Sequence, residues 1–346
     1  MHRCIELAKL GAGAVAPNPM VGAVLVCDDC IIGEGYHRQY GQAHAEVNCI
    51  NNVSEANKHL VEKSTLYVSL EPCSHFGKTP PCADLIIQKN IPSVVIACRD
   101  SFQQVDGRGI QKLQAAGVKV ITPVLEREAL EFNRRFFTFH NQHRPYVILK
   151  WAQTANGKIA NGDYSRLFIS NALTNRAVHH WRSNEASILI GTTTALNDDP
   201  VLTTRLWPGS NPVRLVIDKA LKLPPSLHLF DGTVKTIVFN TIQQEDKGQV
   251  LLYKISGGKS FIAQIMEALY QLNIQSVLVE GGAKLLQSFI DENYWDEARV
   301  ITNPDLIIDA GIPAPLLVNA EQVSGEKILT DTIHYYKNRY SGHNRF

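Results

Sequence analysis

The sequence lacks long apolar runs, an excess of one charge and a regular pattern of cysteines, and each absence excludes a class of protein. No stretch approaches the ~18 apolar residues of a membrane-spanning helix, and the first residues contain no signal-peptide core. The formal net charge of +1 gives no reason to expect a polyanionic partner such as a nucleic acid. The seven cysteines are irregularly spaced, unlike those of a disulfide framework. These absences predict a cytoplasmic protein with neither membrane nor nucleic-acid partners.

The length and composition are those of a globular protein with two domains. A chain of 346 residues is expected to hold about two domains, and a hydrophobic content of 45% is ordinary for such proteins. The polar stretch 140–145 ends in a proline and carries the predicted junction. We therefore expect one domain over residues 1–143 and a second over residues 144–346.

Predicted strands alternate with predicted helices on both sides of this junction. In the first half, strands are predicted at 21–26, 31–35, 65–70, 94–97 and 118–121. In the second half, strands are predicted at 147–151, 188–190, 213–217, 236–239 and 276–280. Caps and apolar periodicity predict helices at 3–10, 44–51, 82–87, 110–116, 171–183 and 261–272. The alternation indicates a layered α/β fold in each half, and either Ser170 or Asn171 caps the helix at 171–183.

A His-x-Glu pair and two later cysteines form the candidate metal site. His44 and Glu46 are followed by Cys73, after a predicted strand, and by Cys82, at the start of a predicted helix. One imidazole and two thiolates supply three ligands to a tetrahedral zinc and leave the fourth position to water. Glu46 then carries protons as a general acid/base, as in zinc deaminases. Eight residues separate the two cysteines, whereas the usual deaminase pattern has two.

The spacing of His44 and Glu46 sets a condition on the local backbone. On a regular helix, residues two positions apart point in directions roughly 200° apart. The two side chains can therefore share one site only if His44 is the helix cap, where the backbone is not yet helical. At the start of its own helix, Cys82 gains from free N–H groups and from the helix dipole, which lower the pKa of a thiol.

Three other interpretations of motifs in this half are a structural zinc site, a second cysteine site and a dinucleotide-binding loop. A structural zinc closed by four protein ligands would leave Glu46 without a role. Cys27 and Cys30 would suit a redox pair or half of a second zinc site, but no second pair lies nearby, and a hairpin turn is the simpler interpretation. The run 11–16 matches the dinucleotide fingerprint G-x-G-x-x-A, but it follows a predicted helix rather than a strand, so we reject it.

Gly281 and Gly282 are better placed to approach a phosphate group. They lie between the predicted strand 276–280 and a following helix, where backbone N–H groups can approach an anion closely. Glycine pairs are common in turns, so the pair by itself is a weak signal.

Long motifs in both halves resemble one known family. In the first half they cover 16–22, 33–37, 44–46 and 71–82. In the second half they cover 149–150, 156–158, 181–183, 191–200 and 279–285. Together they resemble the bifunctional riboflavin-biosynthesis deaminase/reductase, in that family's domain order and over essentially the whole chain. The resemblance implies an N-terminal cytidine-deaminase-like three-layer domain followed by a dihydrofolate-reductase-like α/β domain.

In the deaminase half, the resemblance implies a zinc site and a substrate site. It implies His44, Cys73 and Cys82 as ligands of Zn²⁺ and Glu46 as the proton carrier. The pyrimidine and phosphate site is implied at Asn18, His37, His75, Lys78 and Asp100. The family often has an asparagine where this chain has Phe102.

In the reductase half, the resemblance implies an NADPH site beside a substrate site. Cofactor positions are Ala152, Phe168, Thr194, Asp198, Lys219, Gly282, Ala283, Lys284, Leu285, Leu286, Gln287 and Ser288. Substrate positions are Ser165, Arg182, Leu202, Arg205 and Glu280, with Lys150 orienting the ribose oxygen. Arg182 and Arg205 suit a 5′-phosphate, because a guanidinium binds phosphate through two parallel hydrogen bonds.

The implied function is two consecutive steps of riboflavin synthesis. The first is zinc-dependent hydrolytic deamination of a diaminopyrimidinone that carries a phosphoribosylamino group, and the second is NADPH-dependent reduction of the ribosyl group to ribityl. A homo-oligomer that acts on this small phosphorylated pyrimidine is expected. One alternative is a nucleic-acid base deaminase, which needs a basic surface and no reductase domain. The other is a relative in which one half is inactive.

Overall fold

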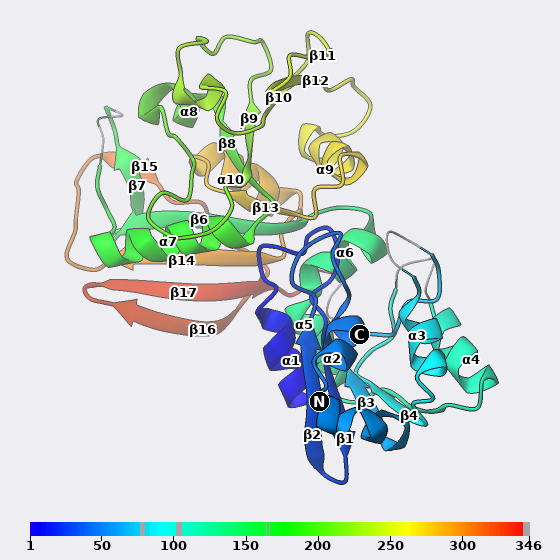
Figure 1. Cartoon of the computed structure of the whole chain (residues 1–346). Helices are drawn as coiled ribbons and strands as arrows, with labels where there is room; N and C mark the ends of the chain where they lie inside the picture. Colours follow the sequence, from blue (N-terminus) through cyan, green and yellow to red (C-terminus); the bar gives the residue numbers. More distant parts are fainter. Residues whose placement is uncertain (77–79, 102–105, 164, 166, 342–346) are drawn as a thin grey trace. The chain divides into compact units, whose positions relative to one another are not determined.

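The computed structural model describes residues 1–76, 80–101, 106–163, 165 and 167–341. The chain divides into two compact units, unit 1 from Met1 to Gln142 and unit 2 from His143 onward. The described strands of each unit pair only within that unit (Figure 1). Each unit also has its own hydrophobic core. Among the described residues, no helix has the length and apolar character needed to cross a membrane.

Unit 1 is built on a five-stranded sheet in the order β2-β1-β3-β4-β5. Its strands are β1 (Gly22–Cys27), β2 (Cys30–Tyr36), β3 (Thr65–Val68), β4 (Ser93–Ile96) and β5 (Lys119–Ile121). Its helices are α1 (His2–Lys9), α2 (Ala45–Asn51), η1 (Glu55–Lys63), α3 (Cys82–Gln88), α4 (Arg108–Ala115), α5 (Glu126–Phe132) and α6 (Arg134–Gln142). Strand β1 pairs antiparallel with β2 and β3, whereas β3, β4 and β5 run parallel.

Helices cover both faces of this sheet, because alternate residues of its strands point to opposite sides. Ala23 and Leu25 of β1 belong to the core cluster that includes residues of α2, α3 and α4. Val24, between them, packs instead with Cys4 and Leu7 of α1. The sheet is therefore the middle of three layers, which confirms the three-layer α/β fold expected for the first half.

The hairpin between β1 and β2 explains the Cys-x-x-Cys motif. Cys27 and Cys30 are paired across the two strands, and the turn residues Asp28 and Asp29 have φ angles of 47° and 59°. Two consecutive left-handed residues are typical of a type I′ turn, for which aspartate is among the favoured residues. The prediction of a hairpin turn at this motif is confirmed.

Unit 2 contains a ten-stranded sheet in the order β11-β12-β10-β9-β8-β13-β6-β14-β17-β16, and a second sheet of β15 and β7. Its strands are β6 (Tyr146–Thr154), β7 (Lys158–Asn161), β8 (Ser187–Gly191), β9 (Val213–Ile217), β10 (Thr236–Asn240), β11 (Glu245–Asp246), β12 (Val250–Lys254), β13 (Ser276–Val279), β14 (Glu297–Asn303), β15 (Gly311–Pro313), β16 (Ala320–Ile328) and β17 (Asp331–Asn338). Its helices are α7 (Ala172–Asn184), α8 (Thr192–Asp198), η2 (His228–Phe230), α9 (Phe261–Gln271) and α10 (Ala283–Asp291). From β12 to β14 in the sheet order, neighbouring strands run parallel.

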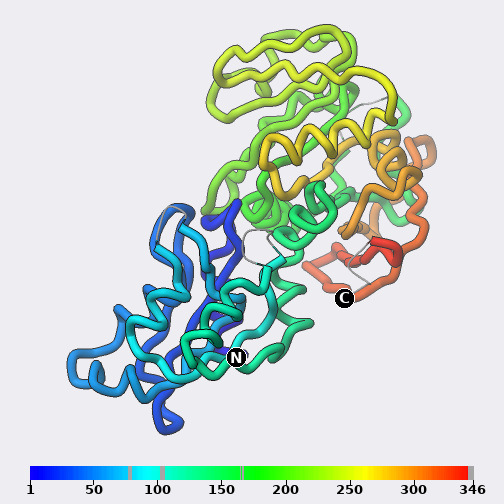
Figure 2. The backbone as a smooth tube through the Cα atoms, turned by 90° about the vertical axis from the view of Figure 1, so that its right-hand side faces the viewer, coloured from blue at the N-terminus to red at the C-terminus, as the bar shows by residue number. Residues whose placement is uncertain are grey.

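Helices cover both faces of the large sheet as well. Residues of α9 and α10 pack with one face of the central strands, in a cluster that includes Leu149, Val277 and Trp295. Residues of α7 and α8 pack on the opposite face, in clusters around Ile301 and Ile190. The helix α9, yellow in Figure 2, runs along unit 2. Parallel strands between two helical layers confirm the α/β fold expected for the second half.

The stretch expected to form the junction is partly helical. Residues 140–142 are the last residues of α6 and not a polar linker. The reason is the apolar face of this helix, since Phe136, Phe137 and Phe139 are all buried. The sequence patterns also missed α5 and strands β14 to β17. Strand β14 pairs with β6 and β17, and β15 pairs with β7, so their registers depend on distant segments, whereas β16 and β17 form a hairpin.

Asn171, and not Ser170, caps α7. The Asn171 side chain accepts hydrogen bonds from the backbone N–H groups of Leu173 and Thr174, at 3.0 Å each. This geometry satisfies two of the N–H groups that a helix start leaves without partners.

Candidate functional site

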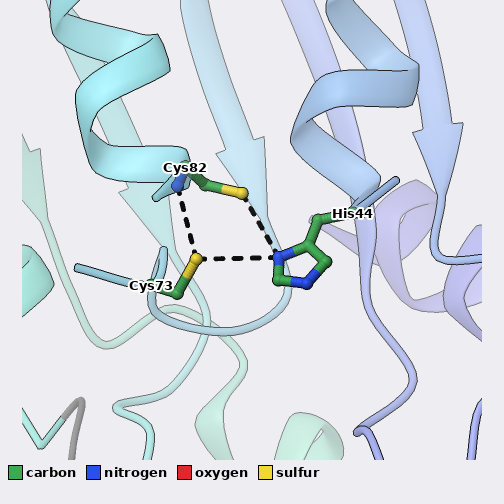
Figure 3. Close-up of side chains that lie close together, drawn as sticks. All are labelled: His44, Cys73 and Cys82. Atoms are coloured by element: carbon green, nitrogen blue, oxygen red, sulfur yellow. Dashed lines mark hydrogen bonds between the residues drawn. The ribbon is translucent and has the colours of Figure 1, made fainter. Parts of the chain in front are cut away.

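The three candidate metal ligands converge in unit 1 from separate elements. His44 is the N-cap of α2, with φ −71° and ψ 168°, so its backbone is extended and not helical. This confirms the condition that the spacing of His44 and Glu46 imposed. Cys82 is the first residue of α3, and Cys73 lies in the loop that follows β3. Figure 3 shows the three side chains pointing toward one another from these elements.

The distances between the ligand atoms fit a tetrahedral zinc. Nδ1 of His44 lies 3.6 Å from Sγ of Cys73 and 3.4 Å from Sγ of Cys82. All three ligand atoms lie within 4.8 Å of one another. Zinc bonds of about 2.0–2.3 Å at tetrahedral angles require ligand atoms roughly 3.5 Å apart. The donor set and the two distances from His44 therefore fit zinc.

The electrostatics of the cluster favour a thiolate at Cys73. The pKa of its thiol is lowered to about 4, chiefly by the hydrogen bond from the Cys82 side chain and then by His44. The Cys82 backbone N–H also donates to Cys73 Sγ at 3.3 Å. The pKa of Cys82 is raised, because the neighbouring Cys73 and burial both disfavour a second negative charge. A bound dication removes this conflict, since coordination stabilises both thiolates.

Glu46 lies in the first turn of α2, and its side chain is buried within the site. Only 3% of the residue is exposed. Burial raises the pKa of its carboxyl group, and the charge of His44 acts in the opposite direction. A raised pKa makes the carboxylate a better proton acceptor, as a general acid/base requires.

Asn18 and His37 are brought next to the zinc ligands. Nδ1 of His37 lies 3.1 Å from the carbonyl oxygen of Ala43, and Nε2 lies 3.1 Å from the side-chain nitrogen of Asn18. The carbonyl can only accept, so Nδ1 carries the proton and Nε2 accepts from the amide of Asn18. Burial lowers the pKa of His37, which favours the neutral ring that these two contacts require. The His37 and His44 rings meet edge to face, with centroids 5.4 Å apart.

The other predicted substrate positions of unit 1 are Asp100, His75 and Lys78. Asp100 is buried just after β4, and His75 is half-buried in the loop between Cys73 and Cys82. Lys78 and Phe102 lie outside the described residues. The role of Lys78 as a substrate contact therefore stays a prediction, and so does the replacement of a substrate-site asparagine by Phe102.

In unit 2, the candidate residues gather at the carboxyl ends of parallel strands. Gly191 ends β8, Lys219 follows β9, and Glu280 follows β13. In sheets of this kind, ligands bind in the crevice beyond the carboxyl ends of the strands. The strand order therefore brings these segments together although the sequence separates them widely.

A buried ion cluster occupies the centre of this edge. The Arg182 guanidinium donates from Nε and Nη2 to the two oxygens of Glu280, each at 2.8 Å. Its Nη1 donates to the carbonyl oxygen of Thr203 at 3.2 Å, and Lys150 Nζ lies 3.5 Å from Glu280. Although burial alone raises the pKa of Glu280, the charges of Arg182 and Lys150 lower it to about 2. The carboxylate of Glu280 is thus ionised and held by two cations.

Three predicted substrate positions of unit 2 differ in solvent exposure and in their contacts. Arg205 is exposed and forms no hydrogen bond or ion pair within the described part of the chain. Leu202 is buried, at 3% exposure, and adopts a left-handed backbone with φ 55°. Ser165 is exposed, and its hydroxyl accepts from Asn161 at 2.9 Å. Of the three, Arg205 has the side chain best suited to bind an anion from solvent.

The glycine pair lies at the start of α10, as expected. Gly282 is the N-cap, and its N–H donates to the hydroxyl of Thr194 at 3.1 Å. A Cβ atom at Gly282 would meet only that hydroxyl, at 3.4 Å, so the space above it is open. A Cβ atom at Gly281 would lie 2.5 Å from Leu285, so Gly281 serves packing. The open approach and the free first N–H groups of a nine-residue helix fit the pyrophosphate of a dinucleotide.

The remaining predicted cofactor positions come from several elements of unit 2. Phe168 is 73% exposed. Lys219 is exposed, with its ammonium group 4.4 Å from the centroid of the Phe261 ring. Partly or fully exposed positions are also Ala152, Asp198, Ala283 and Lys284.

Three predicted cofactor positions of α10 have side chains engaged elsewhere. Leu286 is fully buried in the core, and Ser288 donates to the backbone of Lys284 at 2.9 Å. Gln287 bonds both Asp291 and the backbone N–H of Leu316. Their contribution to cofactor binding stays a prediction.

Sequence reasoning missed two contributors to these sites. Glu71 accepts hydrogen bonds from four backbone N–H groups. Its place in the motif 71–82, two residues before the candidate ligand Cys73, was the only sequence signal of this role. The carbonyl oxygen of Thr203 carried no signal, because every residue has one. Both become apparent only from their long-range hydrogen bonds.

Two family models match the chain. Residues 1–98 match the cytidine and deoxycytidylate deaminase zinc-binding region, and residues 145–324 match the RibD C-terminal domain. The riboflavin biosynthesis protein RibD of Aquifex aeolicus is 38% identical over 312 residues, which cover 89% of this chain and 86% of that protein. RibD of Bacillus amyloliquefaciens is 38% identical over 93% of this chain and 87% of that protein.

A solved structure is similar over both units. It is the diaminohydroxyphosphoribosylaminopyrimidine deaminase/5-amino-6-(5-phosphoribosylamino)uracil reductase of Thermotoga maritima. It is 36% identical, with a TM-score of 0.87, and the match covers 98% of this chain and 97% of that one.

Proposed function

The chain belongs to the RibD family of bifunctional riboflavin-biosynthesis deaminase/reductases, and from this premise we propose how its residues divide the two reactions. The protein is an enzyme with a zinc-dependent deaminase half and an NADPH-dependent reductase half. The observation that carries the division is the separation of two sites, a His/Cys/Cys cluster in unit 1 and a buried ion cluster beside a helix start in unit 2.

For deamination, we propose that His44, Cys73 and Cys82 hold the zinc and that Glu46 moves protons. Zinc held there acts as a Lewis acid, which makes water a nucleophile near neutral pH. Glu46 accepts a proton from the attacking water at its carboxylate and returns it to the departing amino group. Its burial supports this role, because the raised pKa makes the carboxyl group a good proton acceptor.

We propose that the pyrimidine and its phosphate are held by Asn18, His37, His75, Lys78 and Asp100. The contacts of His37 support its part in this site. Its ring is neutral and fixed by Ala43 and Asn18, so it presents a rigid wall beside His44 and brings no second positive charge close to the metal.

Glu46→Gln tests the deaminase proposal. The variant should retain zinc and lose release of ammonia, since an amide cannot carry the proton and Glu46 does not bind the metal. Reduction of the deaminated intermediate by NADPH should be unchanged. Metal analysis and separate assays of ammonia and NADPH decide the matter. Loss of zinc, or deamination at the wild-type rate, contradicts the roles assigned.

For reduction, we propose that Arg205 binds the 5′-phosphate, because its guanidinium is exposed and forms no ion pair within the described residues. Arg182 is engaged by Glu280 and Thr203, so its proposed part is to hold Glu280 in place. Leu202 and Ser165 complete the substrate site, and Lys150 orients the ribose oxygen.

Around the cofactor, NADPH supplies the hydride, and the chain positions it. We propose that Gly282, Thr194 and the first turn of α10 hold the pyrophosphate. Phe168 offers an exposed ring for stacking, and Lys219 offers a cation for a further phosphate group. The positions Ala152 and Asp198 and the rest of the run to Ser288 line this site in the proposal.

Arg205→Ala and Arg205→Lys test the phosphate contact. A bidentate guanidinium–phosphate pair is replaced poorly by an ammonium group and not at all by a methyl group. We expect KM of reduction to rise about tenfold or more for alanine and less for lysine, with ammonia release unchanged. Unchanged KM in Arg205→Ala would assign the phosphate to another residue.

We further propose a domain boundary between residues 143 and 144, with the deaminase domain at 1–143 and the reductase domain at 144–346. The division into two compact units close to this point supports it. Separate expression of the two pieces tests it, each piece retaining its own activity. An N-terminal piece that consumes NADPH would reverse the assigned order.

The location, the assembly and the partners of the protein are proposed as well. We propose a cytoplasmic homo-oligomer that acts on a small phosphorylated pyrimidine and binds no nucleic acid. The balanced charge supports the absence of nucleic-acid binding. The seven free cysteines support a cytoplasmic location, since free thiols suit a reducing compartment. Light scattering measures the mass of the particle, and a titration with tRNA tests the absence of nucleic-acid binding.

A further inference from the structure

Glu71 is a buried carboxylate in unit 1 that the proposed mechanism does not use. Only 3% of the residue is exposed. One oxygen, Oε2, accepts from the backbone N–H groups of Asp100 and Gly107, at 3.2 and 3.0 Å. The other, Oε1, accepts from those of Gly109 and Ile110, at 2.9 and 3.2 Å. Every lone-pair direction of the carboxylate is therefore taken by a backbone donor.

These four bonds join the segment that carries Glu71 to two segments about 30 to 40 residues further along the chain. Glu71 itself follows β3, and its N–H donates to the carbonyl oxygen of Cys98 at 3.0 Å. Asp100 follows the neighbouring parallel strand β4. Gly109 and Ile110 lie in the first turn of α4, where helix N–H groups have no partner within the helix. An anion is favoured there by the helix dipole as well.

The same contact brings α4 directly against the segment that carries a metal ligand. A Cβ atom at Gly109 would lie 2.0 Å from the carbonyl oxygen of Pro72, so only glycine fits this position. Pro72 precedes Cys73 in the chain. Glu71 and the Gly109 contact thus fix the backbone of Cys73 relative to the backbone of Asp100.

We propose that Glu71 is a positioning residue for deamination, which sets the separation between the zinc ligand Cys73 and the substrate contact Asp100. It acts through backbone bonds and touches neither zinc nor substrate. The proposal rests on the proposed role of Asp100 in holding the pyrimidine. A substrate held by Asp100 then meets the metal site in a fixed geometry, and a displacement of about 1 Å in such a contact can cost about a hundredfold in rate.

Glu71→Gln is the test, because glutamine has nearly the same shape but one of its terminal atoms is a donor. That nitrogen would face two N–H groups and accept from neither. We expect kcat/KM of ammonia release to fall about 10- to 100-fold, chiefly through a lower kcat, because the bound substrate would be misplaced relative to the metal site. Zinc content and NADPH-dependent reduction should be unchanged. Glu62→Gln, at an exposed glutamate of the same unit, is the matched control and should behave as wild type.

A double-mutant cycle with Asp100→Asn separates positioning from a merely structural effect. If Glu71 acts through Asp100, the double variant is no slower than Asp100→Asn alone. Losses that multiply, or an unchanged kcat in Glu71→Gln, overturn the proposal. Loss of zinc from Glu71→Gln assigns Glu71 to folding alone and overturns it too. Full deamination by Asp100→Asn removes the proposed substrate contact itself, whereas a wild-type enzyme that releases no ammonia would refute the proposed function.

Discussion

Removing the charge of Glu280 should destabilise unit 2 strongly. Glu280 is buried between Arg182 and Lys150, so Glu280→Gln leaves two cations without their anion. Loss of one partner from a buried pair costs about 3–5 kcal/mol. The lowered pKa gives a similar figure. A carboxyl group whose pKa falls from 4.5 to about 2 on folding contributes about 3 kcal/mol to the free energy of unfolding. We expect the free energy of unfolding to fall by about 3 kcal/mol.

Tryptophan fluorescence measures this loss in unit 2 alone. All four tryptophans lie in unit 2, at positions 151, 181, 207 and 295. Urea unfolding followed by fluorescence therefore reports on the unit that contains Glu280. The control is Glu245→Gln, which breaks an exposed pair with Lys247 and should cost at most about 0.5 kcal/mol. An effect of Glu280→Gln no larger than that of the control would refute the reasoning.

The ionised Glu280 also makes the stability of unit 2 depend on pH. The pKa of Glu280 in the folded protein, about 2, lies below its ordinary value of 4.5. Its contribution is therefore fully present above about pH 4.5 and is lost as pH falls toward 2. Wild type should lose stability across that window more steeply than Glu280→Gln. Equal slopes in urea titrations over that range would contradict the assignment of the charge.

Two further predictions concern the reductase site. Gly282→Val should weaken NADPH binding at least tenfold while ammonia release and zinc content are unchanged, because a branched side chain would fill the space beside Thr194. A fluorescence titration with NADPH checks this, and equal affinity would refute the phosphate cradle. Trp207→Ala should raise KM of reduction about three- to tenfold, because the indole packs against His180 and Arg176 of α7 and so holds the loop that carries Arg205. Trp207→Phe should restore most of the loss in the same NADPH assay, and a normal KM in Trp207→Ala would show that the loop does not depend on the indole.

Features that depend on neighbouring residues could be predicted from the sequence. The extended backbone of His44 followed from the spacing to Glu46, and the hairpin at Cys27 followed from its turn residues. The zinc ligand set followed from residue types and motif spacing, and the structure brings all three ligands together. Such features are local, or they are so specific chemically that few other arrangements satisfy them.

Tertiary structure alone decided how distant segments meet. Arg182 and Glu280 stand 98 positions apart, and their pairing depends on the order of strands in a ten-stranded sheet. The sequence suggested Arg182 as a phosphate ligand, whereas the fold engages its guanidinium with a carboxylate. The bonds of Glu71 to the N–H groups near α4 likewise could not be read from any motif, because backbone donors are the same in every residue. Composition and spacing determine which chemistry is available to this chain, and the strand order determines which groups are left free to perform it.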